Sequence, residues 1–266
     1  MHRLCLDFLT AVEATPPELT RLASANGLDL MAIMVHPAEG VPDFGMASDT
    51  PMRRETRQLC RNLGVAIDMT EGFLLKPDTD CADFVASLES SAWLGACCVN
   101  VLLRDPEVTR LADNFAVFCD FAGELGIEVV TEWSRRTPLP SPAEAAAFIA
   151  AADRPNARLQ FDSLHLFRAG FTAIDLTALD PRIIGRAQLS DGPADMPVER
   201  QFEEALGGRL IPGEGELPLG DFIRALPADT VIGVEVPMTS LQSQGIGPEE
   251  RVRRAVAGTR SLLRYT

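Results

Sequence analysis

The stretch that decides the fold is Leu159-Gln-Phe-Asp-Ser-Leu-His-Leu-Phe-Arg-Ala-Gly170. An apolar segment typical of a strand ends at Asp162, and His165 follows three residues later. Gly170 then turns the chain away. The pattern predicts a strand whose carboxyl end carries chemically active side chains.

Three further apolar runs end in the same way, in an acid or an amide. They are Val129-Val-Thr-Glu132, Ile184-Gly-Arg-Ala-Gln188 and Val231-Ile-Gly-Val-Glu235. If each run is a parallel strand, Glu132, Asp162, Gln188 and Glu235 converge at one end of a sheet or barrel. This convergence is the central hypothesis drawn from the sequence.

Strand-like and helix-like segments alternate along the whole chain. Thr15 is typical of a helix cap with Pro16 at the first helical position, and Ser141 with Pro142 repeats the pattern. Eight such alternations with short connections favour a (β/α)8 TIM barrel, expected as one domain over residues 1–266. The predicted strands are residues 4–9, 28–36, 65–69, 96–103, 127–132, 159–162, 184–191 and 231–235.

Composition excludes several classes of protein. With 46% hydrophobic residues and a mean hydropathy of +0.07, the 266-residue chain can build a large core. No apolar run approaches the roughly 20 residues that a membrane span needs. The N-terminus lacks the apolar segment of a signal peptide, so we expect a cytoplasmic protein without a membrane partner.

Charge and cysteine usage narrow the functions further. A net charge of −14 repels phosphate backbones, which argues against nucleic acid as a partner. The six cysteines are scattered, mostly inside apolar runs, and are expected to be buried free thiols. Lys76 is the only lysine, and nothing around it indicates a Schiff base.

Three carboxylates that meet at strand ends need a cation, because unpaired they repel one another and lose hydration. Glu132, Asp162 and Glu235 with the Gln188 amide form an all-oxygen set, which favours Mg or Mn, although such sites also bind Co or Zn. One divalent ion there could hold two oxygens of a hydroxyketone and stabilise the enediolate formed by proton loss. His165, Glu132 and Glu235 are the candidate proton carriers, since imidazole and carboxylate are general acids and bases.

The order of these residues resembles the xylose isomerase-like TIM-barrel superfamily, whose members are commonly labelled sugar phosphate isomerase/epimerase. The resemblance covers essentially the whole chain and rests on Asp162-Ser-Leu-His165 and on the loop Pro212-Gly-Glu-Gly-Glu-Leu-Pro218. It implies a catalytic divalent ion bound by the four strand-end residues. In ketose 3-epimerases of this superfamily the two glutamates act as acid and base on opposite faces of the sugar. Relatives often form dimers or tetramers, so the resemblance leaves open whether this protein is a homo-oligomer.

Gln188 departs from the ketose epimerases, which typically carry histidine at that ligand. The set with Gln188 and His165 is similar to bacterial 3-dehydroshikimate dehydratases, which eliminate water to give protocatechuate. The first hypothesis is therefore an isomerase or epimerase of a sugar, sugar phosphate or related polyol. The second is a hydro-lyase of the dehydratase type with His165 as base, and the third is a barrel that binds a polyol without turnover.

Several other residues are candidates for substrate contacts. His36 at the end of the second strand could bind substrate or be an ordinary loop histidine. Arg209 could meet a phosphate or carboxylate through its planar fork, or form a surface salt bridge. Glu71 and Trp133 could line the mouth or serve packing.

Asp191 is a candidate for orienting Gln188 from behind, and starting the turn before Gly192 is the alternative. The irregular stretches 37–50 and 191–218 follow the second and seventh strands, where barrel enzymes carry active-site loops. Substrate identity depends on such loops, and a fold resemblance does not supply it.

Overall fold

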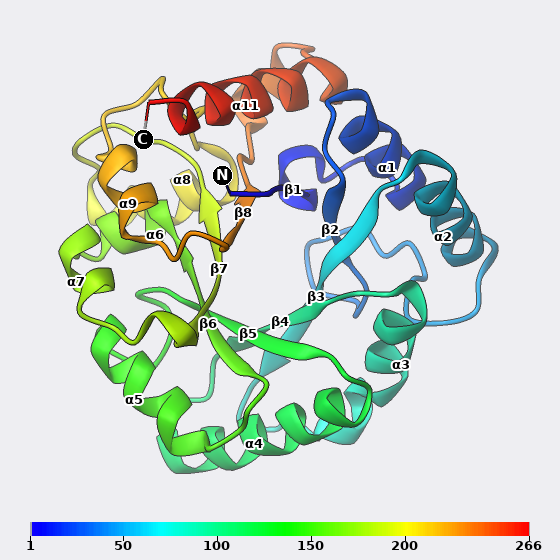
Figure 1. Ribbon diagram of the computed structural model, residues 1–266, viewed down its shortest axis with the longest axis vertical. Helices are drawn as coiled ribbons and strands as arrows, with labels where there is room; N and C mark the ends of the chain where they lie inside the picture. Colours follow the sequence, from blue (N-terminus) through cyan, green and yellow to red (C-terminus); the bar gives the residue numbers. More distant parts are fainter. Residues whose placement is uncertain (1, 266) are drawn as a thin grey trace.

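The chain forms a closed barrel of eight parallel strands that follow one another in sequence order around the ring (Figure 1). The computed structural model describes residues 2–265. β1 pairs with β8, with Leu4 opposite Ile232, and this pairing closes the ring. The strands are β1 (Leu4–Asp7), β2 (Leu30–Met34), β3 (Ala66–Leu75), β4 (Cys98–Leu103), β5 (Glu128–Trp133), β6 (Ala157–Asp162), β7 (Ile184–Leu189) and β8 (Val231–Val234). The (β/α)8 architecture expected from the sequence is confirmed.

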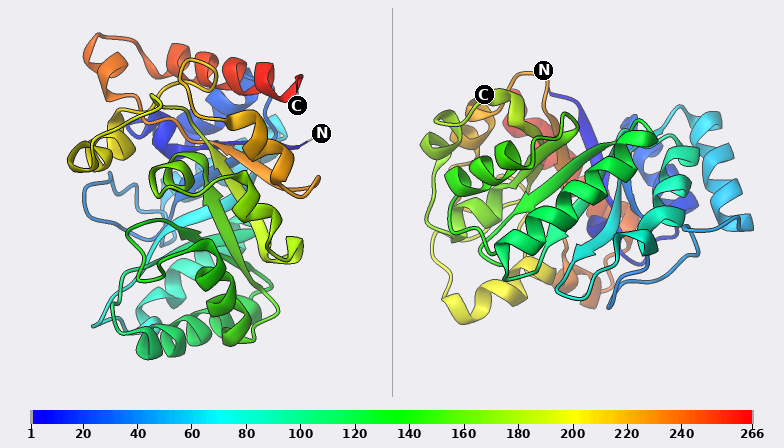
Figure 2. Two further views of the ribbon diagram at one scale, coloured as in Figure 1. Left: turned by 90° about the vertical axis from the view of Figure 1, so that its left-hand side faces the viewer. Right: turned by 90° about the horizontal axis from the view of Figure 1, so that it is seen from below.

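Helices surround the strands as an outer ring, which Figure 2 shows from two further sides. The longer ones are α1 (Pro16–Ala25), α2 (Pro51–Leu63), α3 (Val85–Leu94), α4 (Val108–Glu124), α5 (Pro142–Ala152) and α11 (Pro248–Leu263). The short α-helices are α6 (Ser163–Arg168), α7 (Ala173–Thr177), α8 (Gln201–Gly207), α9 (Leu219–Ala225) and α10 (Thr239–Ser243). Single 3-10 turns are η1 (Phe8–Ala11), η2 (Cys81–Phe84), η3 (Pro181–Ile183) and η4 (Val198–Arg200). Between residues 2 and 265, none of these helices is both long and apolar enough to cross a membrane.

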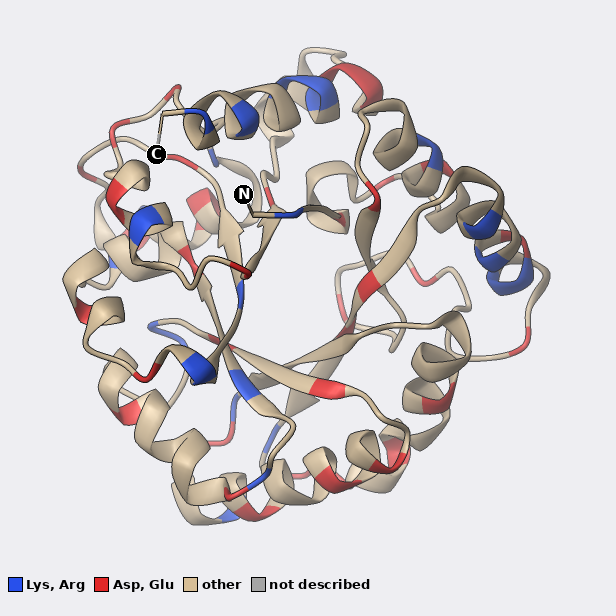
Figure 3. Cartoon of the chain, in the orientation of Figure 1, with Lys and Arg blue, Asp and Glu red and all other residues tan. Residues whose placement is uncertain are grey.

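The predicted helix caps are present. Thr15 and Glu18 form a reciprocal capping box at the start of α1, and the Ser141 hydroxyl accepts the Glu144 N–H at the start of α5. Arginines gather on the outward helices α2 and α11 (Figure 3). Arg251 of α11 instead is buried, in an ion pair with Glu13.

β3 is longer than the sequence indicated, because it continues through Gly72 with a shift of register. Gly72 has φ +112°, and a Cβ there would collide with the carbonyl oxygen of His36. Only glycine allows this close approach of the two chains. Glu71, expected after the third strand, therefore lies inside β3 and is buried.

Apolar residues fill the layer between strands and helices, while the barrel interior is partly polar. A small apolar group closes one level of the interior: Cys5, Leu30, Ala32, Met69, Cys98 and Val130. Beside it the fully buried Arg186 guanidinium donates to Asp7 Oδ1 at 2.8 Å and to Asp68 Oδ2 at 3.2 Å. All six cysteines are free thiols, and Cys97 alone of them is exposed.

Candidate active site at the barrel mouth

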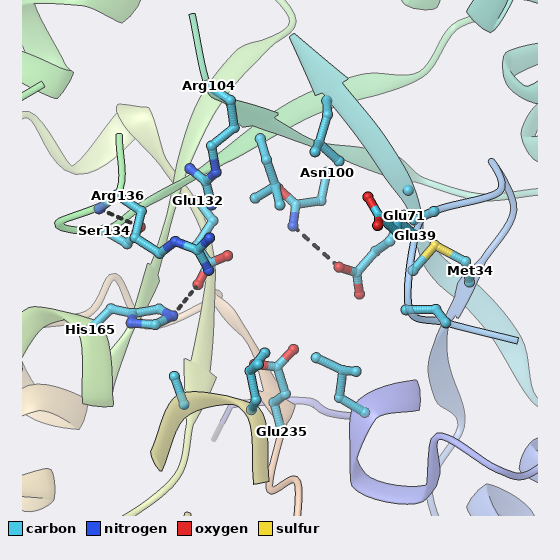
Figure 4. Close-up of a pocket in the computed structure, with 18 of the residues that line it drawn as sticks. Met34, Glu39, Glu71, Asn100, Arg104, Glu132, Ser134, Arg136, His165 and Glu235 are labelled. Carbon is cyan, nitrogen blue, oxygen red and sulfur yellow. Dashed lines mark hydrogen bonds and ion pairs between the residues drawn. The ribbon is translucent and has the colours of Figure 1, made fainter. Parts of the chain in front are cut away.

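A cavity of about 790 Å³ opens where the strands end, at the carboxyl face of the barrel. Figure 4 shows the carboxylates of Glu71, Glu132 and Glu235 directed into it from different strands. His165 and Arg209 also line it. Of the four predicted strand-end residues, Glu132 and Glu235 therefore lie in one cavity.

Glu132 and His165 form a close pair, with Glu132 Oε1 3.2 Å from His165 Nε2. The Asp162 carboxylate accepts the backbone N–H of His165 at 3.0 Å and so caps α6. That cap explains the Asp-x-x-His spacing, because it fixes the first turn that carries the imidazole to Glu132. The two side chains are mostly shielded from solvent, with 20% and 14% of their surface exposed for His165 and Glu132.

Arg209 binds two of the proposed ligands at once. Its Nη1 lies 2.5 Å from Asp162 Oδ2 and its Nη2 lies 3.0 Å from Glu235 Oε2. Arg209 is 5% exposed and its Nε donates to the Ala205 carbonyl. Burial alone would raise the pKa of Asp162, but the adjacent guanidinium lowers it below its ordinary value. Burial raises the pKa of Glu235 well above its usual range, against the opposing effect of Arg209.

The Gln188 side chain is held by Asp7 and Glu235 rather than by Asp191. Its Nε2 donates to Asp7 Oδ2 at 2.8 Å and to Glu235 Oε1 at 2.7 Å, and its Oε1 accepts from Gln160 Nε2 at 2.8 Å. Two acceptors at one end of the amide require the nitrogen at that end. The Gln188 oxygen therefore points to Gln160 in this arrangement.

These contacts decide how the proposed ligands lie. Within residues 2–265, no three Asp, Glu, His or Cys side chains are grouped so as to hold a metal ion. Arg209 separates Asp162 from Glu235, and Glu132 is engaged by His165. The strand ends converge, but their side chains are not arranged around one common point.

The donor set nevertheless suits a divalent cation. Asp162 and Glu235 already share one positive charge, that of the Arg209 guanidinium. Carboxylate oxygens are ligands of Mg and Mn, and Glu132 opens onto the same cavity. Gln188 could bind the ion through its amide oxygen only after the amide flips, which exchanges the positions of its oxygen and nitrogen.

Glu71 and His36 lie on the wall formed by β2 and β3. Burial, followed by the Asp7 charge, raises the pKa of Glu71 to about 8, and Asn100 Nδ2 donates to its Oε2 at 3.3 Å. His36 Nδ1 is 2.9 Å from the Ser87 hydroxyl, and its ring stacks on Phe73. Burial lowers the pKa of His36, so this wall presents neutral groups near pH 7.

Trp133 does not lie at the mouth, contrary to one of the two readings of the sequence. Successive side chains of a strand point to opposite sides, so Glu132 faces the cavity and Trp133 faces the helices. Trp133 is 1% exposed, its Nε1 donates to the Leu139 carbonyl at 3.0 Å, and its ring packs edge-on against Phe171. Trp133 is a packing residue.

Asp191 supports the Pro-Gly-Glu-Gly loop. Of the two roles that the sequence left open, orienting Gln188 is supported by no contact among the described residues, because the Gln188 amide bonds to Asp7, Glu235 and Gln160. The Asp191 carboxylate accepts the backbone N–H groups of Gly213, Gly215 and Leu217 at 2.9 to 3.1 Å, and that of Gly192 at 2.8 Å. A Cβ at Gly215 would collide with the Asp191 carboxylate. The loop glycines allow the backbone to wrap around one acid.

Sequence reasoning missed the charged residues inside the barrel and three arginines at its rim. Asp7, Asp68 and Arg186 are buried in strands, where a charged residue in a predicted strand could have signalled a polar interior. Arg104 follows β4, Arg135 and Arg136 come in the loop after β5, and all three line the cavity. Arg104 directly follows a predicted strand and the other two come shortly after one, which was the available signal.

Solved structures share this fold at low identity. An IolI protein with a binding zinc atom is 17% identical, with a TM-score of 0.81 over 99% of this chain and 98% of that chain. The D-allulose 3-epimerase from Methylomonas sp. in complex with D-allulose is 14% identical, with a TM-score of 0.72 over 98% and 96%. The probable 3-DHS dehydratase AsbF of Bacillus anthracis, involved in petrobactin synthesis, is 13% identical, with a TM-score of 0.75 over 94% and 97%. These likenesses show the fold.

No curated protein sequence matches the chain. The profile of the family described as xylose isomerase-like TIM barrel matches residues 20–262, which is most of the chain. This chain therefore belongs to the xylose isomerase-like TIM barrel family.

Proposed function

We propose that this protein is a divalent-metal-dependent isomerase or epimerase of a sugar, sugar phosphate or related polyol. The observation that carries the proposal is that Glu132 and Glu235 face one cavity from β5 and β8, with His165 against Glu132 (Figure 4). Two carboxylates on different sides of a cavity suit the removal and return of a proton at one carbon. The D-allulose 3-epimerase likeness supports a sugar substrate.

Glu132, Asp162, Gln188 and Glu235 are the residues that would hold the metal ion. When bound, a divalent ion would supply a Lewis acid that polarises a carbonyl next to the reacting carbon. Arg209 forms ion pairs with two of these four residues, Asp162 and Glu235. At least one of these ion pairs would have to break for the ion to bind. The zinc named for the IolI structure supports a divalent ion here.

The protein's own groups perform the proton transfers. Glu132 takes a proton from the substrate carbon, and His165, 3.2 Å away, can receive it and hold it for return. Glu235 serves the opposite side of the substrate from β8. The buried walls restrict water around these groups, which strengthens their electrostatic interactions.

A hydro-lyase that dehydrates 3-dehydroshikimate or a similar cyclic polyol is the second candidate. Gln188, in place of the histidine typical of ketose epimerases, favours it, and so does the likeness to the probable 3-DHS dehydratase. In this reaction His165 would be the base that removes the proton. Glu132 would then orient the imidazole through the 3.2 Å contact.

One assay series separates these functions. The protein is stripped of metal, reloaded with Mn or Mg, and incubated in deuterated water with a panel of ketoses and ketose phosphates. Metal-dependent deuterium uptake beside the carbonyl marks an isomerase or epimerase. Metal-dependent ultraviolet absorbance of an aromatic product from 3-dehydroshikimate marks the dehydratase.

Glu132→Gln and Glu128→Gln make a matched pair for these assays, because both acids lie on β5 and only Glu132 faces the cavity. We expect Glu132→Gln to lower the rate by about 100-fold or more, and Glu128→Gln to leave it unchanged. Turnover without added metal, or full activity of Glu132→Gln, would contradict the proposal. Calorimetric binding of a ketose with no turnover would instead identify a binding barrel.

A further inference from the structure

Arg104 and Arg136 form a pair of cationic side chains at the rim of the cavity. Arg104 follows β4 and Arg136 follows β5, and both line the cavity. Figure 4 shows both side chains reaching toward the same wall, around Glu132. Neighbouring strands thus deliver two guanidinium groups to one place.

Neither guanidinium has an acidic partner among residues 2–265. Arg104 Nη1 donates to the Leu103 carbonyl at 3.0 Å, and the Arg136 guanidinium lies 4.5 Å from the centre of the Phe202 ring. No carboxylate of the described chain lies within ion-pair distance of either group. Glu132, the acid between them, is paired with His165 instead.

The other arginines deep in the cavity are occupied. Arg168 binds Glu204 in a two-pronged contact with both distances 2.7 Å, and Arg209 binds Asp162 and Glu235. Arg209, which the sequence suggested for a substrate phosphate or carboxylate, is therefore already engaged. Arg104, Arg135 and Arg136 line the cavity without a carboxylate partner among the described residues. Arg135 Nη1 is engaged by the Arg168 carbonyl and by Gln201 Oε1, which leaves Arg104 and Arg136 as the pair around Glu132.

Two unpaired cations side by side are unfavourable unless an anion joins them. Arg104 is half-buried and Arg136 is exposed. Burial lowers the pKa of Arg104, the nearby Glu132 charge opposes this, and the Arg136 charge adds to the lowering. The chain has 38 acidic and 24 basic residues, so acids to pair with these arginines are abundant. Leaving both arginines unpaired in a cavity is typical of a binding site for an anionic group.

We propose that Arg104 and Arg136 bind a carboxylate or phosphate of the substrate. The inference rests on the proposed function and narrows its substrate to anionic polyols. With the anion at this rim, the polyol part extends toward Glu132 and Glu235. Glu39, the acid on the opposite wall beside the neutral Glu71, disfavours an anion there and sets the direction of binding.

Calorimetric titration of the Mn-loaded and the metal-free protein tests this site. The probes are matched pairs that differ in charge: D-fructose 6-phosphate against D-fructose, and shikimate against its methyl ester. The phosphate pair and the carboxylate pair distinguish the two sources of negative charge. The variants are Arg104→Gln and Arg136→Gln, with Arg61→Gln as control, since Arg61 is exposed on α2 and outside the cavity.

We expect wild type to bind one charged probe at least about tenfold more tightly than its neutral partner. Each cavity variant should lose about tenfold of that affinity and little for the neutral probe, whereas Arg61→Gln should match wild type. Equal binding of charged and neutral probes by wild type, including no binding of either, overturns the proposal. So does unchanged anion affinity in both cavity variants.

The deuterium-exchange assay separates a failure of this site from a failure of the proposed function. If neutral ketoses are turned over and the arginine variants match wild type, the anion site is wrong and the isomerase stands. If anions bind through Arg104 and Arg136 but no probe exchanges a proton with or without metal, the anion site stands and the proposed reaction is wrong.

Discussion

Arg209 joins Asp162 to Glu235, with its Nη1 2.5 Å from the first carboxylate and its Nη2 3.0 Å from the second. Asp162 is the last residue of β6 and Glu235 follows β8, with β7 between these strands, and all three side chains are buried. Breaking a buried ion pair by removing one partner leaves an uncompensated charge. The guanidinium therefore stabilises the mouth of the barrel.

Arg209→Gln should lower the unfolding free energy of the metal-free protein by about 3 kcal/mol, because the buried Asp162 carboxylate then loses its cationic partner. Added Mn should raise the melting temperature more in this variant than in wild type, since the bound ion then supplies the positive charge that Arg209 supplied. Differential scanning fluorimetry over a series of Mn concentrations measures both effects. Arg224→Gln, which breaks an exposed pair with Asp221, is the control and should behave as wild type. An equal Mn response in wild type and Arg209→Gln would show that Arg209 does not compete with the ion.

Glu132 and His165 should act as one unit in catalysis. Each single substitution, Glu132→Gln or His165→Gln, should lower kcat by about 100-fold or more, because each breaks the 3.2 Å contact. The double variant should lose little beyond the worse single variant, since groups that act together are not additive. Steady-state kinetics of the four proteins on the substrate found in the assay series gives the coupling. If the decrease in kcat of the double variant equals the product of the two single decreases, the two residues work independently.

Glu71 should make stability depend on pH. Its pKa is raised from 4.5 to about 8 in the folded protein, so the folded state holds a proton that the unfolded state releases. The stability linked to that proton is complete below about pH 4.5 and is lost as the pH rises toward about 8. Glu71→Gln, which stays neutral, should gain stability relative to wild type between pH 5 and about 9, by a few kcal/mol at most.

Melting temperatures of the chelator-treated proteins across this range measure the effect. Glu128→Gln, with an exposed acid on β5, should follow the wild-type curve. A Glu71→Gln curve parallel to that of wild type would show that Glu71 is ionised in the folded protein.

Asp191 should control the order of the loop around Gly213 and Gly215. Asp191→Ala removes the acceptor of three loop amides, so amide hydrogen exchange at Gly213, Gly215 and Leu217 should accelerate by about tenfold or more. Asp195→Ala, at an exposed acid nearby in sequence, is the control. Unchanged protection in Asp191→Ala would show that the loop is held by other contacts.

The sequence was sufficient for the barrel because each strand and helix carries local signals. Thr15 and Ser141 cap helices where expected, and the period of apolar residues placed all eight strands. The predicted strand boundaries were less accurate where the backbone geometry depends on a residue distant in the sequence. The extension of β3 through Gly72 requires the approach of His36, which no local pattern reveals.

The candidate site was predictable only at the level of strand ends. Glu132, Asp162 and Glu235 end apolar runs, and parallel strands bring such positions together. Their pairing was not predictable, because Arg209 lies 47 residues beyond Asp162, in a loop whose path depends on Asp191. Trp133 and Glu132 show the same limit, since adjacent residues of one strand differ only in the side they face.

The Asp7–Arg186 ion pair joins residues 179 positions apart, on β1 and β7. Protein synthesis therefore exposes Asp7 and the β1 edge long before their partners emerge from the ribosome. A nascent chain that stops short of β7 has an aspartate facing an unfinished apolar wall, and one short of β8 has an open sheet. The buried charge of Asp7 thus finds its partner only once β7 has been made, and the ring closes only once β8 has been made.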